Sequence, residues 1–140
     1  MENLTRNFVE NPNEETFSLI EISSFALNDV FKRYPSLADQ FFQFKHWFLL
    51  YRDRNNSLDV KKKLGESVKT FDDAVKYYFA LNYEGRQEYA PKLIEKASTV
   101  RELTTTLHYL GNAYRQPIVT KMHEIATTDE DKEFVKYYKV

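Results

Sequence analysis

The sequence of 140 residues contains no cysteine, only three glycines and four prolines, and no long apolar run. The absence of cysteine excludes disulfides, thiol catalysis and cysteine-ligated zinc. The longest apolar stretch, Trp47 to Tyr51, falls far short of the ~20 residues that a membrane-spanning helix needs. Residues 1–13 carry no apolar leader, so we expect a cytoplasmic protein with no membrane partner.

The sequence also lacks an excess of charge of either sign. Lys and Arg total 20 and Asp and Glu total 21, for a net charge of −1. This balance argues against a dedicated nucleic-acid binder, whose phosphate contacts need a basic surface. It leaves little electrostatic repulsion between copies, so a homodimer stays open.

Apolar residues recur at spacings of three and four along the chain, and no alternating pattern indicates a strand. We therefore predict an all-α fold: a flexible segment over 1–13, then a single compact bundle of about six or seven helices over 14–140. The pairs Thr70 with Asp73 and Thr99 with Glu102 have the spacing of helix-starting capping boxes. The predicted helices cover 14–33, 37–52, 70–82, 91–97, 99–114, 117–126 and a last helix from 127, with a weaker pattern over 57–64.

Segments 70–97 and 99–126 could each form a pair of helices. Paired helices of this size also build repeat proteins. The two segments do not share residue types at matching offsets, so the sequence favours one bundle over a repeat array.

The predicted helix over 37–52 is rich in aromatic residues and apolar on nearly all sides. Such a helix is either central in its own domain or covered by a second chain, and both interpretations stay open. If a partner covers it, Trp47, Phe48 and Tyr51 are the candidate anchors, because aromatic side chains dominate binding energy at interfaces.

A polar stretch over 52–69 follows, with six basic and three acidic residues. It includes Lys61, Lys62 and Lys63, which could steer the encounter with a partner or contact phosphate groups. A solvated basic segment without a specific role is the common alternative.

Metal and nucleotide chemistry lack their usual motifs. His123-Glu124 begins like the zinc motif His-Glu-x-x-His, but Thr127 occupies the position of the second histidine. No glycine-rich loop is present to bind a phosphate. We therefore expect no metal and no cofactor.

Arg101 and His108 lie seven positions apart, nearly two helical turns, so both project from one side of a helix about 10 Å apart. An arginine can neutralise charge that develops on a phosphodiester, and a histidine can move a proton. The spacing resembles the Arg-x(4–6)-His motif of HEPN-type ribonucleases, small all-helical proteins that usually dimerise. Tyr109 after the histidine fits this family, whereas Glu102 stands where the family usually has Asn, Asp or His.

The sequence favours a small non-enzymatic helical protein that binds another protein, as an inhibitor, immunity protein or adaptor. The alternative is a HEPN-like ribonuclease, a toxin or defence effector, that uses Arg101 and His108. A second alternative is nucleic-acid binding through residues 52–69. In the favoured interpretation, the residues that contact the partner are Trp47, Phe48, Tyr51, Lys61, Lys62 and Lys63.

Overall fold

A computed structural model describes residues 2–140, so Met1, the start of the predicted flexible segment, lies outside the described residues. Eleven α-helices and one 3-10 helix form within residues 2–140, without a strand, which confirms the all-α prediction. The helices outnumber the six or seven predicted, because two predicted helices are each divided in two and further helices form over Glu2–Glu10 and Leu58–Glu66. The chain divides into two compact units, Met1–Lys69 (unit 1) and Thr70–Val140 (unit 2).

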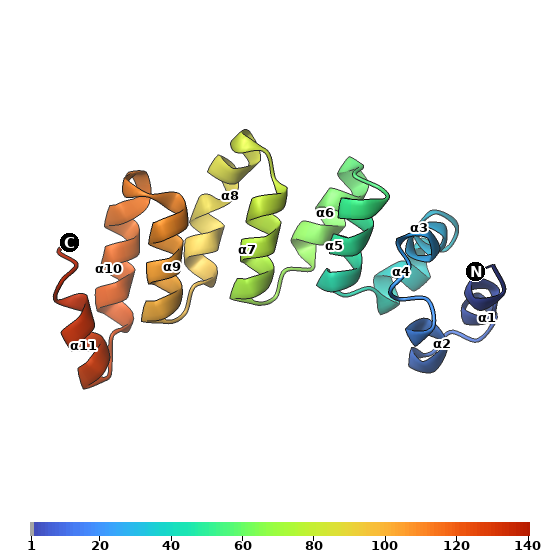
Figure 1. Cartoon of the computed structure of the whole chain (residues 1–140), viewed down its shortest axis with the longest axis horizontal. Helices are drawn as coiled ribbons and strands as arrows, with labels where there is room; N and C mark the ends of the chain where they lie inside the picture. Colours follow the sequence, from blue (N-terminus) through green and yellow to red (C-terminus); the bar gives the residue numbers. More distant parts are fainter. Residues whose placement is uncertain (1) are drawn as a thin grey trace. The chain divides into compact units, whose positions relative to one another are not determined.

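Unit 1 contains six short helices that pack in chain order (Figure 1). The first helix packs against the second and third, the third against the fourth and fifth, and the fifth against the sixth. These helices are α1 (Glu2–Glu10), α2 (Glu14–Ser18), α3 (Ser24–Arg33), α4 (Pro35–Phe41), α5 (Phe44–Asp53) and α6 (Leu58–Glu66).

Helix α1 occupies most of the segment that we expected to be flexible. Its Phe8 is fully buried, with its ring centroid 5.4 Å from that of Phe17 and 5.0 Å from that of Phe41. Its apolar residues Leu4, Phe8 and Val9 are few, and they lie in a short segment that is otherwise polar. The contact that docks α1 comes from other helices, so local pattern did not indicate it.

The predicted helices over 14–33 and 37–52 are each broken in two. At the first break, the Ser23 hydroxyl accepts a hydrogen bond from the backbone N–H of Ala26 (3.2 Å) and starts α3. At the second break, the backbone N–H of Gln43 donates to Nδ1 of His46 (2.9 Å) and starts α5. Both bonds occupy backbone donors that have no acceptor at the start of a helix.

His46 also ties the start of α5 to the segment before α3. Because Nδ1 accepts a backbone hydrogen bond, the ring proton lies on Nε2, which donates to Oε1 of Glu21 (3.0 Å). Burial disfavours the imidazolium and lowers the pKa of His46, although Glu21 opposes this effect. The hydrogen bond from His46 in turn lowers the pKa of Glu21.

Unit 2 continues the same pattern with helices that pack in sequence, each against the next. The helix pairs predicted over 70–97 and 99–126 are confirmed as α7 with α8 and α9 with α10. The elements are α7 (Phe71–Ala80), α8 (Tyr83–Lys96), α9 (Val100–Leu110), the 3-10 turn η1 (Asn112–Tyr114), α10 (Arg115–Ile125) and α11 (Asp129–Val135).

Local capping explains where the helices of unit 2 begin. Both predicted capping pairs are present at the starts of α7 and α9, with Asp73 N–H to Thr70 Oγ1 at 3.1 Å and Glu102 N–H to Thr99 Oγ1 at 3.0 Å. Helix α8 begins well before the predicted start near Pro91, because Asn82 accepts from the backbone N–H of Gly85 (2.8 Å).

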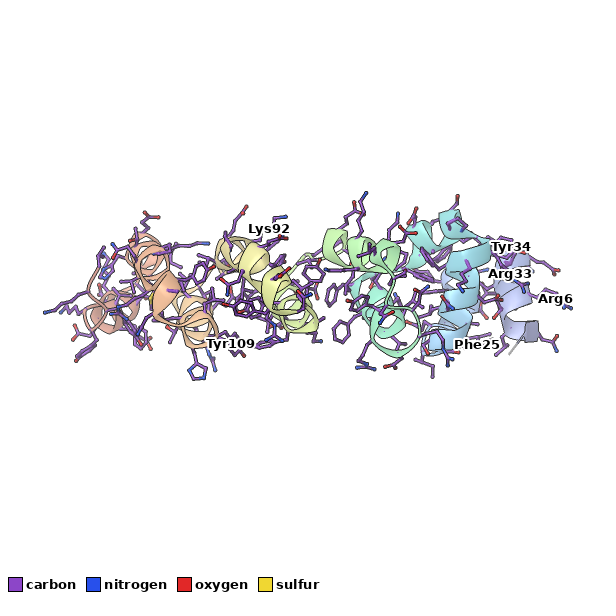
Figure 2. All side chains as sticks on the ribbon, turned by 90° about the horizontal axis from the view of Figure 1, so that it is seen from above. Arg6, Phe25, Arg33, Tyr34, Lys92 and Tyr109 are labelled. Carbon is purple, nitrogen blue, oxygen red and sulfur yellow. The ribbon has the colours of Figure 1, made fainter. Side chains whose placement is uncertain are left out.

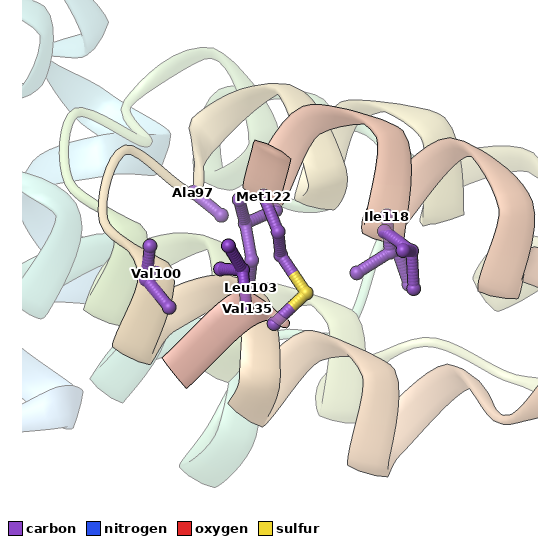
Figure 3. Packing of buried hydrophobic residues seen from close by; sticks show 7 residues of the cluster. Ala97, Val100, Leu103, Ile118, Met122 and Val135 are labelled. Atoms are coloured by element: carbon purple, nitrogen blue, oxygen red, sulfur yellow. The ribbon is translucent and has the colours of Figure 1, made fainter. Parts of the chain in front are cut away.

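Within each unit, most pairs of helices that contact each other are next to each other in sequence or separated by one helix. A ten-residue helix is only about 15 Å long, so it can bury its apolar face against adjacent helices and little else. Figure 3 shows one core cluster of unit 2, to which α9, α10 and α11 contribute. Its buried members are Ala97, Val100, Leu103, Ile118, Val119, Met122 and Val135.

Candidate protein-binding surfaces

Trp47, the central candidate anchor, belongs to the core of unit 1. Its side chain is only 3% exposed. Its ring makes edge-to-face contacts with Phe31 (centroids 5.5 Å apart) and Phe42 (4.9 Å). An anchor must be accessible before its partner arrives, so this geometry gives Trp47 a structural role.

Phe48 and Tyr51 lie on the same helix but are half-buried. Phe48 stacks on Phe44 with ring centroids 5.7 Å apart, and the guanidinium of Arg52 lies 5.6 Å above the Phe48 ring. These two residues are therefore the part of the predicted aromatic anchor set that remains at the surface of unit 1.

The three lysines of the basic stretch lie on α6 in different surroundings. Lys63 forms an ion pair with Asp39 of α4 (Nζ to Oδ1, 2.7 Å), and this hydrogen bond raises the pKa of Lys63. Lys61 is half-buried and Lys62 is exposed. Part of the predicted basic charge is thus compensated inside unit 1.

Arg101 and His108 lie in the first and last turns of α9, and both are exposed. Within residues 2–140, neither side chain has a hydrogen bond or ion pair. Glu102, the residue that departs from the HEPN-type motif, accepts hydrogen bonds from the backbone and hydroxyl of Ser98 (2.8 and 3.2 Å). The arginine and histidine are accessible, and their joint action on one phosphodiester stays a prediction.

An aromatic surface that the sequence analysis did not predict lies beside His108. Phe79 of α7 is 46% exposed and Tyr109 of α9 is 39% exposed. Their rings meet edge to face, with centroids 4.9 Å apart. Figure 2 labels Tyr109 at this edge of the chain. We call the surface formed by Phe79 of α7, His108 and Tyr109 of α9, and the adjoining Arg86 of α8 the α7/α9 surface.

Arg86 of α8 contacts both the end of α7 and the ring of Phe79. Its Nε donates to the carbonyl of Tyr78 (3.2 Å) and its Nη2 to the carbonyl of Phe79 (2.9 Å). Its guanidinium lies 5.2 Å from the centroid of the Phe79 ring. The last carbonyls of a helix have no partner within the helix, so Arg86 caps α7 and is itself immobilised.

Phe79 and Tyr78 are neighbours in the predicted helix over 70–82, but only Tyr78 is buried, at 8% exposed. Arg86 lies between the predicted helices over 70–82 and 91–97, where the sequence predicted no helix. Tyr109 was noted only as a residue that fits the HEPN-type motif, so no sequence signal indicated this surface.

A cleft of about 510 Å³ lies between α1 and α3. Its lining includes two guanidinium and two carboxylate groups, and Arg33 pairs with Asp29 (3.0 Å). These charges balance, so the cleft does not select a ligand by net charge. Figure 2 labels four of the lining residues, which together are Thr5, Arg6, Val9, Glu10, Phe25, Asp29, Arg33 and Tyr34.

Two further observations concern residues 2–140. No group of three or more histidine or acidic side chains in this part of the chain is arranged to hold a metal ion. None of its helices combines the length and apolar composition needed to cross a bilayer.

Comparisons with models of protein families, with curated proteins and with solved structures found no match to this chain.

Proposed function

We propose that this protein is a non-enzymatic helical module that binds another protein through the α7/α9 surface, as an inhibitor, immunity protein or adaptor. The observation that carries the proposal is the exposed edge-to-face pair of Phe79 and Tyr109. The cytoplasmic location expected from the sequence stays a prediction.

Two physical features support a binding role for this pair. Aromatic and arginine side chains contribute a large share of the energy at protein interfaces, and Phe79, Tyr109 and Arg86 supply both kinds. The two carbonyls that hold Arg86 also limit its motion, which reduces the entropy lost when a partner binds.

The test is affinity capture from the source cells with three forms of the full chain. The first is the wild type, the second is the double variant Phe79→Ser/Tyr109→Ser, and the third is Tyr137→Ser. Tyr137 is 79% exposed and lies outside the surface, so it is the matched control. We expect the wild type and the control to retain the same protein and the double variant to lose it. Equal retention by all three, with unchanged thermal unfolding, would contradict the proposal.

The partner can also be a second copy of the chain. Light scattering across a concentration series measures the solution mass of the wild type and the double variant. A wild-type dimer that dissociates on Phe79→Ser/Tyr109→Ser would identify the α7/α9 surface as a subunit interface.

The ribonuclease alternative keeps one favourable observation, which is the exposure of Arg101 and His108 without polar partners in residues 2–140. RNA cleavage by the wild type that disappears in His108→Ala would support it. Equal behaviour of the two proteins would exclude it. Nucleic-acid binding through residues 52–69 loses support because Lys63 is already paired with Asp39.

A further inference from the structure

We infer that the partner presents a carboxylate beside an apolar side chain, and that Arg86 binds the carboxylate. This inference rests on the proposed function, since it concerns the same α7/α9 surface. It specifies the chemistry of the segment that docks there: an apolar side chain against Phe79 and Tyr109, with an aspartate or glutamate next to it.

The guanidinium of Arg86 has more hydrogen-bond donors than residues 2–140 use. A guanidinium has five N–H donors. Arg86 uses two of them on the carbonyls of Tyr78 and Phe79. The other three have no acceptor in the described part of the chain, and no unpartnered side-chain nitrogen there is buried, so these donors are accessible. An incoming acceptor can therefore reach them while Arg86 stays bonded to α7.

The positive charge of Arg86 is unpaired, because Arg86 forms no ion pair with the described residues of the chain. Glu84 and Glu88 flank it in sequence, but residues two apart on a helix do not face each other. The positive charge of Arg86 is therefore not matched by a carboxylate in the part of the chain that the structure describes. An arginine fixed in this way binds a carboxylate through charge-assisted hydrogen bonds.

Arg86 lies close to the aromatic pair. Its guanidinium is 5.2 Å from the centroid of the Phe79 ring, and this ring contacts that of Tyr109. A carboxylate on Arg86 therefore lies next to the aromatic pair. In an extended peptide, which advances about 3.3 Å per residue, the acidic residue stands one or two positions from the apolar one.

The experiment selects phage-displayed random dodecapeptides on the full-length wild type and measures their affinities. Each enriched peptide is then tested on Phe79→Ser/Tyr109→Ser and resynthesised with Asn or Gln in place of its acidic residue. Changing the peptide leaves the protein untouched, which matters because Arg86 also caps α7. Arg86→Gln is a second test, interpreted only if its thermal unfolding matches that of the wild type.

We expect enriched peptides to carry an acidic residue within two positions of an apolar one. Their affinity should fall at least about tenfold when that acid is neutralised, the effect of a lost charge-assisted hydrogen bond. If the peptides depend on Phe79 and Tyr109 but tolerate the neutral residue, the carboxylate inference is wrong and the proposed function stands. If no peptide depends on the aromatic pair, both are wrong.

Discussion

Replacing Trp47 with alanine tests whether this residue supports unit 1 or contacts a partner. The indole is 3% exposed and packs between the rings of Phe31 and Phe42. The substitution removes this ring and leaves a cavity that short helices on either side can fill only in part.

The magnitude follows from that environment. Truncation of a buried tryptophan to alanine costs about 3–5 kcal/mol, including the cavity. The two edge-to-face contacts account for about 0.5–1.5 kcal/mol each within that total. A domain of this size is stable by only about 5–15 kcal/mol, so Trp47→Ala should remove about a fifth or more of the stability of unit 1.

The assay is urea denaturation followed by far-UV circular dichroism, because the variant lacks the only tryptophan of the chain and cannot be followed by its fluorescence. Trp47→Phe is the matched control, and it should lose about 1–2 kcal/mol because it keeps a ring in the site. A loss below about 1 kcal/mol in Trp47→Ala would refute the assignment of this residue to the core. If Trp47→Ala is fully folded and yet binds the partner more weakly, that result would also refute the assignment.

Two further predictions concern pH and backbone conformation. Because burial lowers the pKa of His46 below its ordinary value of 6.5, the unfolded chain takes up this proton first as the pH falls. The free energy of unfolding should therefore decrease below about pH 6.5, and further as Glu21, whose pKa is also lowered, is protonated. Urea midpoints at pH 7.5 and 5.0 measure this decrease, and an equal decrease in His46→Gln would assign it to other groups. Gly111 ends α9 with φ 74° and ψ −166°, a conformation nearly exclusive to glycine, and a Cβ there would contact nothing within 4 Å. Gly111→Ala should thus cost about 1–3 kcal/mol from backbone strain alone, and an unchanged thermal unfolding temperature would contradict this account.

The breaks in the predicted helices show where local pattern stops being informative. Phe42 continues the apolar periodicity of its neighbours, yet α4 ends at Phe41 and α5 begins at Phe44, after a new hydrogen bond from Gln43 to His46. A histidine that accepts from a backbone N–H is not a common helix-starting signal. Its second bond, to Glu21, joins residues 25 positions apart, and no local rule predicts such a contact.

Local sequence pattern also does not show which apolar side chains are exposed. Trp47 and Phe79 both lie in rows of apolar residues with helical spacing, and the sequence could not rank their exposure. In the structure, Phe31 and Phe42 cover Trp47, while Phe79 stays 46% exposed. Exposure depends on which helix packs on which face, and that is a tertiary property.

The sequence by itself determined the helical class, the helix pairs α7–α8 and α9–α10, and the capped starts at Thr70 and Thr99, because periodicity and capping act within a few residues. The tertiary structure alone decided the division into two units and the exposure of each aromatic residue. It also decided the use of Arg86 as a cap for another helix. These depend on contacts between helices whose partners are set by packing, and short helices joined by short connections pack on their neighbours in sequence.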